Sequence, residues 1–460
     1  MLLHNTTIIT VDSQRHIITD GALVVQNDRI VAVGKAAEII ERYPAEEKVN
    51  LGGKTLIPGL VDTHVHLAQA LIRGCADDME LIQWLCDRVW VLQGNFTEDD
   101  GRVSAQLCIA EMLKSGTTTF IESMLADRYG FSGVAEVVRE SGIRACIGKI
   151  VMDIGTYATQ SNAMYPGMRE TREQSLLGAL KMYDQWNGKA DGRIRVWFGP
   201  RTPGGVTPEL YREMVGEARK RGMGITMHLA EVESDKTYLN ENYGLTPVDF
   251  AESVGLLGPD VVLVHMVWLT QPELEKLART GTHVSHNPSS NTKLASGVCK
   301  VPQMLAAGVN VALGCDGGPS NNDYDLIREM KLAAIIHKGV TRDPLIVPAE
   351  TVLEMATING AKAVGMADQI GSLEVGKKAD LVVIDFDRLH TTPNPNPIST
   401  LVYAATGGEV DAVMIDGKWM VRGQQLLTMD EEQVKVTARK HAVDLYKRAG
   451  IELKPRWPVL

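Results

Sequence analysis

The segment PGLVDTHVHLAQALIRG, residues 58–74, decides how the rest of the chain can be interpreted. Its apolar run ends in a His-x-His pair, His64 and His66. In a β-strand, residues two apart point to the same face of the sheet. Two imidazoles at the end of one strand can therefore reach a single ion from the inside of a barrel, provided that further strands follow.

Seven further apolar runs do follow, with helical stretches between them. Thr207-Pro208 predicts the start of one helix and Gly222 its end. Thr270 and Glu273 form a capping box for another helix, which Gly281 ends. The eight predicted strands are residues 60–67, 116–123, 144–151, 194–201, 224–231, 261–269, 283–288 and 310–317.

Eight strand–helix units between residues 58 and 375 fit a closed (β/α)8 TIM barrel, an α/β fold. An open, doubly wound sheet is the alternative. Against it, no G-x-G-x-x-G lies in a first strand-to-helix turn, and the chain has no P-loop.

Short strands are predicted at both ends of the chain. Turns are indicated at Asn27-Asp28 and at Asp416-Gly417. We expect the two ends to form one small β-sandwich domain, with residues 1–57 as its first part and 376–430 as its second. Residues 431–460 are expected to be a C-terminal helix and tail. The strands proposed for this domain are residues 7–11, 22–26, 29–33, 379–385 and 411–421.

Composition excludes several classes of function. The chain has 460 residues, with 57 acidic and 47 basic side chains and a net charge of −10. A general nucleic-acid or anionic-membrane partner is not expected, because phosphate binding needs a basic face. No apolar run is long enough to span a membrane, and the N-terminus lacks a signal-peptide pattern. Six cysteines without a C-x-x-C pair suit a reducing cytoplasm.

Residues with metal or acid–base chemistry gather at the ends of the predicted strands, where barrel active sites form. Imidazole nitrogens with one carboxylate suit Zn²⁺ or Fe²⁺ better than Mg²⁺ or Ca²⁺. Taken singly, each residue has a plainer interpretation as a packing or turn residue; together they reinforce one another. The set is His64, His66, His228, Glu231, His265, His286 and Asp316.

Seven motifs, in this order, give the chain its resemblance to a known family. They are PGLVDTHVHLAQALIRG (58–74), GTTTFIE (116–122), HLAE (228–231), SHNPSSNTKLASG (285–297), LGCDGGPSNN (313–322), ATINGAKAVGM (356–366) and IGSLEVGKKADLVVID (370–385). On these motifs the chain resembles the amidohydrolase superfamily over nearly its whole length. Within it, the chain looks like the branch that holds S-adenosylhomocysteine/methylthioadenosine deaminases, guanine deaminases and triazine hydrolases, and its C-terminal stretch looks closest to the triazine hydrolases.

The resemblance implies one divalent metal ion, zinc first and iron second. His64, His66, His228 and Asp316 would bind it. Glu231 would be the proton shuttle, and His265 would lie beside the attacking water or act as a loose fifth ligand. No lysine follows the fourth strand, where FGPRTPGG stands, which agrees with a single metal. Asp316 would also orient the water.

The resemblance further implies a deaminase of an amino-substituted nitrogen heteroaromatic ring, purine-like or triazine-like. The same residues could also act on a ring from which chloride leaves instead of ammonia. The alternative is an S-adenosylhomocysteine/methylthioadenosine-type nucleoside deaminase. A non-catalytic scaffold of the same fold would have lost ligands, whereas this chain keeps all of them. A homodimer or homotetramer is expected from the resemblance.

Five residues are candidates for substrate contacts: Trp84, Gln93, Arg201, His286 and Ser320. Trp84 matches a tryptophan that packs on the ring in this branch, and its plainer interpretation is a core aromatic. Nucleoside deaminases of the branch carry glutamate where Gln93 stands and a histidine where Arg201 stands. The five donors of Arg201 suit a ring carbonyl. Helix capping explains Ser320 equally well.

Two further positions depart from the branch. Gly317 replaces the polar residue that triazine hydrolases carry next to the aspartate. Trp268 replaces a second histidine after the sixth strand, where it could narrow the pocket.

Overall fold

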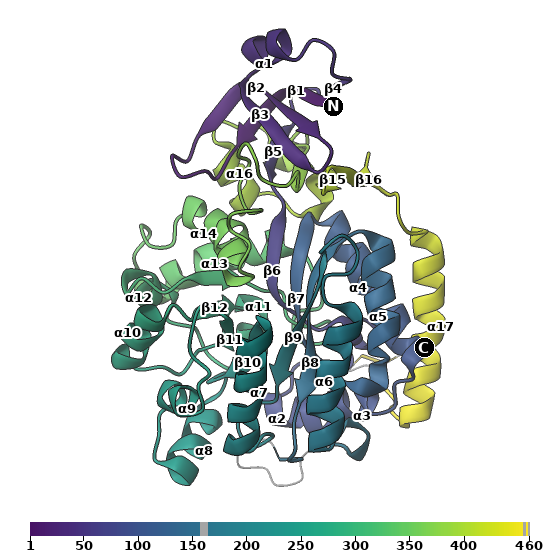
Figure 1. Ribbon diagram of the computed structural model, residues 1–460, viewed down its shortest axis with the longest axis vertical. Coiled ribbons are helices and arrows are strands. Elements are labelled where there is room, and N and C mark those ends of the chain that lie inside the picture. Colours follow the sequence, from purple (N-terminus) through teal and green to yellow (C-terminus); the bar gives the residue numbers. More distant parts are fainter. Residues whose placement is uncertain (157–163, 454–456, 459–460) are drawn as a thin grey trace.

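The computed structural model describes residues 1–156, 164–453 and 457–458. The chain forms an eight-stranded parallel barrel with helices around it and a nine-stranded, mainly antiparallel sheet at one end (Figure 1). This is the α/β barrel with a second β-domain that the sequence predicts.

The barrel strands lie side by side in the order of the sequence. The first and last strands meet through a parallel bridge between Val65 and Asp316, which brings the two edges of the sheet together. All eight predicted runs contain a strand, so the strand prediction is confirmed. The strands are β6 (Leu60–Val65), β7 (Thr117–Leu125), β8 (Arg144–Val151), β9 (Ile194–Pro200), β10 (Ile225–Leu229), β11 (Val261–His265), β12 (His283–His286) and β13 (Val311–Leu313).

Two helices on the outside of the barrel begin and end where the sequence predicts. The Thr207 side chain accepts from the backbone N–H of Leu210 at the start of α7. Gly222 and Gly281 end α7 and α10 with the left-handed backbone that glycine adopts readily. The helices between β7 and β13 are α5 (Phe131–Ser141), α6 (Arg172–Trp186), α7 (Pro208–Arg221), α8 (Glu233–Tyr243), α9 (Pro247–Ser253), α10 (Gln271–Thr280), α11 (Pro288–Lys293) and α12 (Val301–Ala306).

The connection from β6 to β7 is long and mostly helical. It begins with the 3-10 turn η1, directly after His66, and ends with α4, which packs against η1. The connection therefore returns over the carboxyl end of the barrel. It consists of η1 (Leu67–Ile72), α2 (Leu81–Trp84), η2 (Leu85–Val89), α3 (Trp90–Gln93) and α4 (Glu98–Lys114).

The second sheet is built from both ends of the chain, as predicted. Its order is β17-β16-β15-β14-β5-β1-β2-β3, with β4 paired to β1. The antiparallel pair β14–β5 joins the C-terminal part to the N-terminal part. The strands are β1 (Leu2–Ile9), β2 (Ile17–Gln26), β3 (Arg29–Lys35), β4 (Lys48–Asn50), β5 (Thr55–Pro58), β14 (Leu381–Ile384), β15 (Val410–Ile415), β16 (Lys418–Arg422) and β17 (Gln425–Leu426).

Both predicted turns are present in this sheet. Asn27 joins β2 to β3, and Asp416-Gly417 joins β15 to β16, each with positive φ. Leu2 and Leu3 belong to different buried clusters, because neighbouring residues of a strand face opposite sides of the sheet. The short helix α1 (Ala36–Arg42) covers the face that carries Leu2.

The remaining helices follow β13 in the sequence and include the last helix of the chain. The last helix, α17, begins after Asp430 as predicted and packs along α4, with Val434, Ala438 and Leu445 buried (Figure 1). It is exposed on its other face. These helices are α13 (Leu326–Thr341), α14 (Ala349–Ala356), α15 (Ile358–Ala363), α16 (Pro397–Tyr403) and α17 (Glu431–Ala449).

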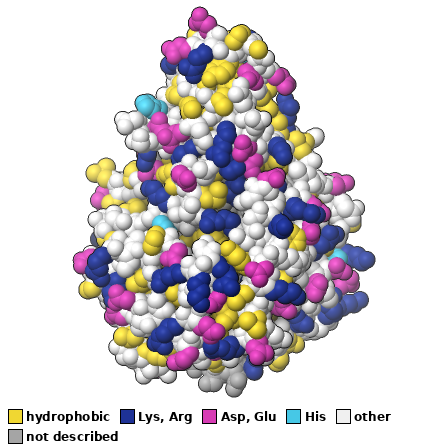
Figure 2. Space-filling model, in the orientation of Figure 1, with side chains coloured by type: hydrophobic (Ala, Val, Ile, Leu, Met, Phe, Trp, Pro, Cys, Tyr) yellow, Lys and Arg dark blue, Asp and Glu magenta, His cyan; other side chains and the backbone are white. Residues whose placement is uncertain are grey.

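The surface carries charges of both signs. Figure 2 shows Lys and Arg side chains interspersed with Asp and Glu over the visible face. Within the described residues, no helix has both the length and the apolar character needed to cross a membrane.

Candidate active site

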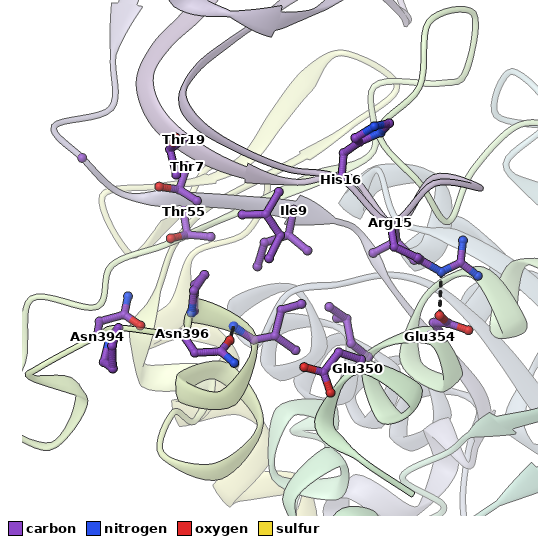
Figure 3. Close-up of a pocket in the computed structure, with 17 residues that line it drawn as sticks. Thr7, Ile9, Arg15, His16, Thr19, Thr55, Glu350, Glu354, Asn394 and Asn396 are labelled. Atoms are coloured by element: carbon purple, nitrogen blue, oxygen red, sulfur yellow. Dashed lines mark hydrogen bonds and ion pairs between the residues drawn. The ribbon is translucent and has the colours of Figure 1, made fainter.

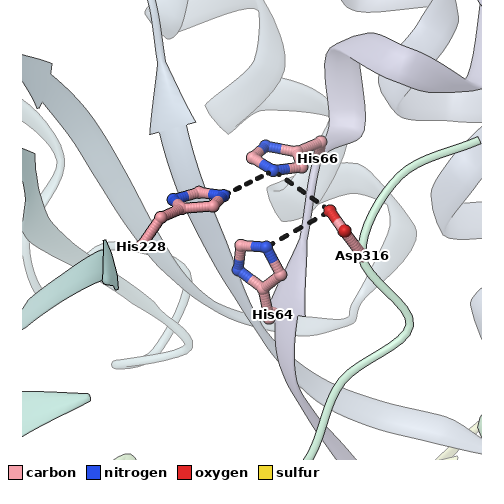
Figure 4. A group of neighbouring side chains, drawn as sticks. All are labelled: His64, His66, His228 and Asp316. Atoms are coloured by element: carbon pink, nitrogen blue, oxygen red, sulfur yellow. Dashed lines mark hydrogen bonds and ion pairs between the residues drawn. The ribbon is translucent and has the colours of Figure 1, made fainter. Parts of the chain in front are cut away.

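Two strands and one loop bring together four buried side chains of types that can bind a metal ion. His64 and His66 come from the end of β6, His228 from β10, and Asp316 from the loop that follows β13 (Figure 4). One potential ligand atom of each lies within 4.8 Å of those of the other three. Each of the four residues is at most 7% exposed.

Three of the six distances between these potential ligand atoms fit a tetrahedral ion, and all six are within 4.8 Å. Asp316 Oδ1 lies 3.2 Å from His64 Nε2 and 3.3 Å from His66 Nε2. His66 Nε2 lies 3.2 Å from His228 Nε2. Zinc bonds of about 2.0–2.1 Å would place tetrahedral ligand atoms about 3.3 Å apart. The donor set, three imidazoles and one carboxylate, is also one that zinc accepts.

The protonation of the cluster favours cation binding. Burial, offset in part by Asp316, lowers the pKa of His64 to about 3. Burial and the neighbouring histidines lower the pKa of His228 well below its usual value. Although burial opposes it, contact with His64 and His66 keeps the pKa of Asp316 well below the usual range. At neutral pH these groups present lone pairs and one negative charge to the space between them.

A buried carboxylate joins the two segments that carry His64 and Asp316. Asp62 Oδ1 accepts from the backbone N–H of His64 and from that of Cys315, each at 3.1 Å. The backbone at Asp316 itself has φ +67°. A non-glycine residue held in the left-handed region is a local strain that often marks functional positions.

Glu231 and His265 lie together beside the four clustered side chains. His265 Nε2 is 3.6 Å from Glu231 Oε2. His265 Nδ1 lies 2.8 Å from Asn291 Oδ1, which can only accept, so this nitrogen carries the proton. Nε2 is then an unprotonated acceptor that faces Glu231. Burial, with the charges of Asp316 and Asp235, raises the pKa of Glu231 well above its usual value.

Three of the five candidate substrate residues line the cavity that leads to this cluster. They are Trp84, Gln93 and Arg201. The Arg201 guanidinium lies over the Trp90 ring, 5.3 Å from its centroid. Sequence reasoning missed other lining residues, among them Gln69, Trp90, Tyr129, Met168 and Thr202. Two of them could have been found from the sequence. Trp90 follows Trp84 by six residues, and Gln69 is the polar residue in the apolar run LAQALI.

Three other residues lie outside the set that lines this cavity, as far as the described residues show. His286 Nε2 contacts His337 Nε2 at 3.2 Å, and the two rings pack against each other. Ser320 donates to the Gly317 carbonyl oxygen and closes the turn after Asp316. Trp268 donates to the carbonyl oxygen of Ser296. Any effect of these residues on substrate would be indirect.

A larger cavity, of about 630 Å³, lies between the N-terminal strands and helices α14 and α16 (Figure 3). Arg15 and Glu354 form an ion pair at its edge. None of the metal-ligating residues lines it. We therefore place the chemistry in the smaller cavity, where the donors converge.

Comparison with known proteins gives the family. The amidohydrolase family model matches residues 55–420. The chain belongs to the amidohydrolase family. The resemblance inferred from the motifs is thereby confirmed.

Relatives of this amidohydrolase cover almost its whole length. A 5-methylthioadenosine/S-adenosylhomocysteine deaminase of Syntrophobacter fumaroxidans is 40% identical, over 95% of this chain and 97% of that protein. The zinc-bound crystal structure of an adenosine deaminase from Xanthomonas campestris superposes with a TM-score of 0.90 at 32% identity, covering 97% of this chain and 98% of that one. The zinc complex of an atrazine chlorohydrolase from Arthrobacter aurescens shares the fold, with a TM-score of 0.87 at 23% identity over 96% and 99% of the two chains.

Proposed function

We propose that this amidohydrolase is a metal-dependent deaminase that hydrolyses the C–N bond of an amino group on a nitrogen heteroaromatic ring. The observation that carries the proposal is the cluster of three imidazoles and one carboxylate, with Glu231 buried beside it in the same cavity. Zinc is the proposed metal, held by His64, His66, His228 and Asp316. When bound, such an ion would lower the pKa of a water molecule to about 7 and so would supply a nucleophile at neutral pH.

Two side chains beside the proposed metal site, His265 and Glu231, would assist the attack of water. His265 would accept a hydrogen bond from the attacking water at Nε2, because its Nδ1–H donates to Asn291 Oδ1. Glu231 takes the proton of the attacking water and passes it to a ring nitrogen, which makes the neighbouring ring carbon more electrophilic. Its raised pKa suits this role, since a carboxyl group that must give its proton to a ring cannot be a strong acid.

We favour a free base with a ring carbonyl over an intact nucleoside. Gln93, which lines the cavity, presents an uncharged amide where nucleoside deaminases of the branch are expected to carry a carboxylate. Arg201 is 6% exposed and lines the same cavity, so its donors are placed to meet an acceptor on the ligand.

Deamination of an adenosine derivative is the second candidate. It is favoured by the 40% identity to a methylthioadenosine/S-adenosylhomocysteine deaminase over nearly the full chain. Both candidates use the same metal ligands and the same shuttle; they differ in whether the wall formed by Gln93 and Arg201 accepts a ribose.

A screen for ammonia release tests the proposal. Zinc-loaded protein is incubated with purine bases, pterins, aminotriazines and adenosine derivatives, and the Glu231→Gln variant serves as the blank. We expect turnover of an oxo-bearing amino base above that of methylthioadenosine. Turnover of adenosine derivatives alone would favour the second candidate. A wild-type protein that holds zinc and releases ammonia from no compound would refute both.

The metal content also separates an enzyme from a scaffold. Purified protein with less than about a tenth of an equivalent of tightly held metal would favour a non-catalytic role, since a closed set of buried ligands binds zinc strongly. Iron as the resident metal, a homodimer or homotetramer, and a cytoplasmic location stay predictions.

A further inference from the structure

Lys293 connects three loops at the carboxyl end of the barrel. It is the last residue of α11, which follows β12. Its Nζ lies 2.6 Å from Asp77 Oδ1, in the connection after β6, and donates to the Pro319 carbonyl oxygen at 2.8 Å, in the loop after β13. It also donates to Asn322 Oδ1 in that loop. One ammonium group thus joins the loops that follow three neighbouring strands of the barrel.

Both partners of the ion pair between Lys293 and Asp77 stand close in sequence to residues that line the cavity of the proposed metal site. Leu294 follows Lys293 directly and lines this cavity. Asp77 lies shortly before α2, whose first and last residues, Leu81 and Trp84, also line it. The ion pair therefore connects two parts of the cavity wall that are distant in the sequence.

The segment that carries Asp77 depends on side-chain contacts for its position. Residues 73–80, between η1 and α2, contain turns and bends but no helix or strand. At the start of the segment, Arg73 forms an ion pair with Glu111 of α4. Near its end, Asp77 Oδ1 contacts Lys293 and lies 3.4 Å from Asn322 Nδ2. Without a ladder of backbone hydrogen bonds, these contacts help to decide where α2 lies.

We propose that Lys293 is a positioning residue: through Asp77 it holds α2, and with it Trp84, in the cavity wall and so limits access to the proposed metal site. The inference rests on the proposed function only in taking this cavity as the place where the metal binds. A partly exposed ion pair contributes modestly by itself, whereas Lys293 also donates two hydrogen bonds to the loop after β13. Loss of Lys293 should therefore have a larger effect than loss of the Asp77 charge.

The first test measures how readily a small planar chelator, dipicolinate, reaches zinc in the loaded protein. The rate constant of zinc removal is followed as a function of the dipicolinate concentration. Its slope reports entry of the chelator into the cavity, and its intercept reports spontaneous release of the ion. We expect Lys293→Met to raise the slope about ten-fold and Asp77→Asn to raise it about two- to five-fold, with intercepts close to that of wild type.

Three further variants serve as controls. Lys276→Met removes a partly buried lysine that pairs with Asp249 of α9, outside the set that lines the cavity as far as the described residues show, and should leave the slope unchanged. Lys293→Arg keeps the charge and should retain most of the wild-type behaviour. In the Lys293→Met background, Asp77→Asn should add little. An unchanged slope with a raised intercept in Lys293→Met would overturn the proposal, because Lys293 would then support the ion and not the wall. Additive effects in the double variant would also overturn it.

Amide hydrogen exchange tests the same inference without zinc or turnover. In metal-free protein, amides of residues 73–84 should exchange about five-fold or more faster in Lys293→Met than in wild type, whereas those of α9 and α10 should not change. A smaller increase in the same residues is expected in Asp77→Asn. Protein that binds no zinc would contradict the proposed function and leave this measurement in force. Wild-type exchange of residues 73–84 in both variants, or faster exchange spread over the whole chain in both, would overturn the role of Lys293.

Discussion

The backbone N–H of Asp316 donates a hydrogen bond to the carbonyl oxygen of His64 at 2.7 Å. The last proposed ligand in the sequence is thereby attached to the first one, at the place where β6 and the end of β13 meet. Asp62 reinforces this junction by accepting from the backbone on both sides. The contact that joins the two edges of the barrel therefore also assembles the site. We expect substitutions of the proposed ligands to change both the metal content and the stability of the protein.

Removal of one imidazole tests the ligand set. His66→Ala should lower the zinc affinity by at least about 100-fold, because loss of a direct ligand exceeds the usual effect of outer partners. Metal content after dialysis against a weak chelator measures it. His390→Ala, which removes a half-exposed histidine near the second sheet, is the control and should keep wild-type metal content. Full zinc occupancy in His66→Ala would show that the site is misplaced.

Loss of the proton shuttle should separate binding from chemistry. Glu231→Gln should retain zinc but lower kcat by about 10²–10⁴-fold, the usual contribution of a positioned acid–base group. The exposed neighbour Glu233, at the start of α8, provides the matched Glu233→Gln control, for which near wild-type kcat is expected. Steady-state kinetics and metal analysis on the same preparations provide the measurement. A kcat of Glu231→Gln close to that of wild type would remove the residue from the mechanism.

Arg201 should discriminate between the two substrate candidates. Arg201→Ala should weaken binding of an oxo-bearing base by about ten-fold or more and affect a methylthio nucleoside less, because only the former offers a carbonyl to the guanidinium. Arg201→Lys keeps the charge but not the planar stack on Trp90, so it should recover only part of the affinity. Competition titrations with both ligands measure this. Equal effects on the two would exclude a contact to the ring carbonyl.

The sequence predicted well the barrel and the clustering of His64, His66, His228 and Asp316, because both follow from local patterns. His64 and His66 share a face of one strand, and strand ends of a parallel barrel meet at one edge. Thr207, Gly222 and Gly281 identified helix ends because capping and left-handed glycines act within a few residues.

The wall of the cavity was less predictable. Gln69 and Trp90 lie in the connection between β6 and α4, and their position depends on how that connection folds back over the barrel. His286 ends its strand as predicted, yet its contact is His337 on α13, which no local pattern indicates. Partners distant in sequence decide which strand-end residues face the substrate.

A buried ion-pair cluster connects the barrel to the second sheet and should govern stability. Arg144, at the start of β8, contacts Asp380 at 3.0 Å and Asp416 at 2.8 Å. Arg144→Met leaves two buried carboxylates without this partner and should cost about 3–5 kcal/mol. The exposed Arg328, which pairs with the partly buried Asp323, offers the control Arg328→Met, expected to cost about 0–1 kcal/mol. Urea unfolding measures the stability of both variants. Similar losses of stability in the two would contradict the conclusion that burial makes the Arg144 ion pairs important.

Glu329 should make stability depend on pH. It is buried on α13 and accepts from the Ser289 backbone N–H at 3.2 Å and from Asn321 Nδ2 at 2.9 Å. Burial raises its pKa to about 8. The folded protein thus binds this proton more tightly than the unfolded chain does. The resulting stability is fully present below the unfolded pKa of about 4.5 and is lost as the pH rises through about 8.

The thermal midpoint should accordingly fall between pH 6 and 9, with a slope in the free energy of unfolding of up to about 1.4 kcal/mol per pH unit from this group. Glu329→Gln cannot ionise and should lose less stability than wild type over that range. Asp62 and Glu122, whose pKa values burial raises to about 7, act in the same direction in both proteins, so only the difference between the two curves is diagnostic. Glu432→Gln, at an exposed position on α17, should leave the curve unchanged. Parallel curves for Glu329→Gln and wild type would mean that Glu329 keeps an ordinary pKa in the folded protein.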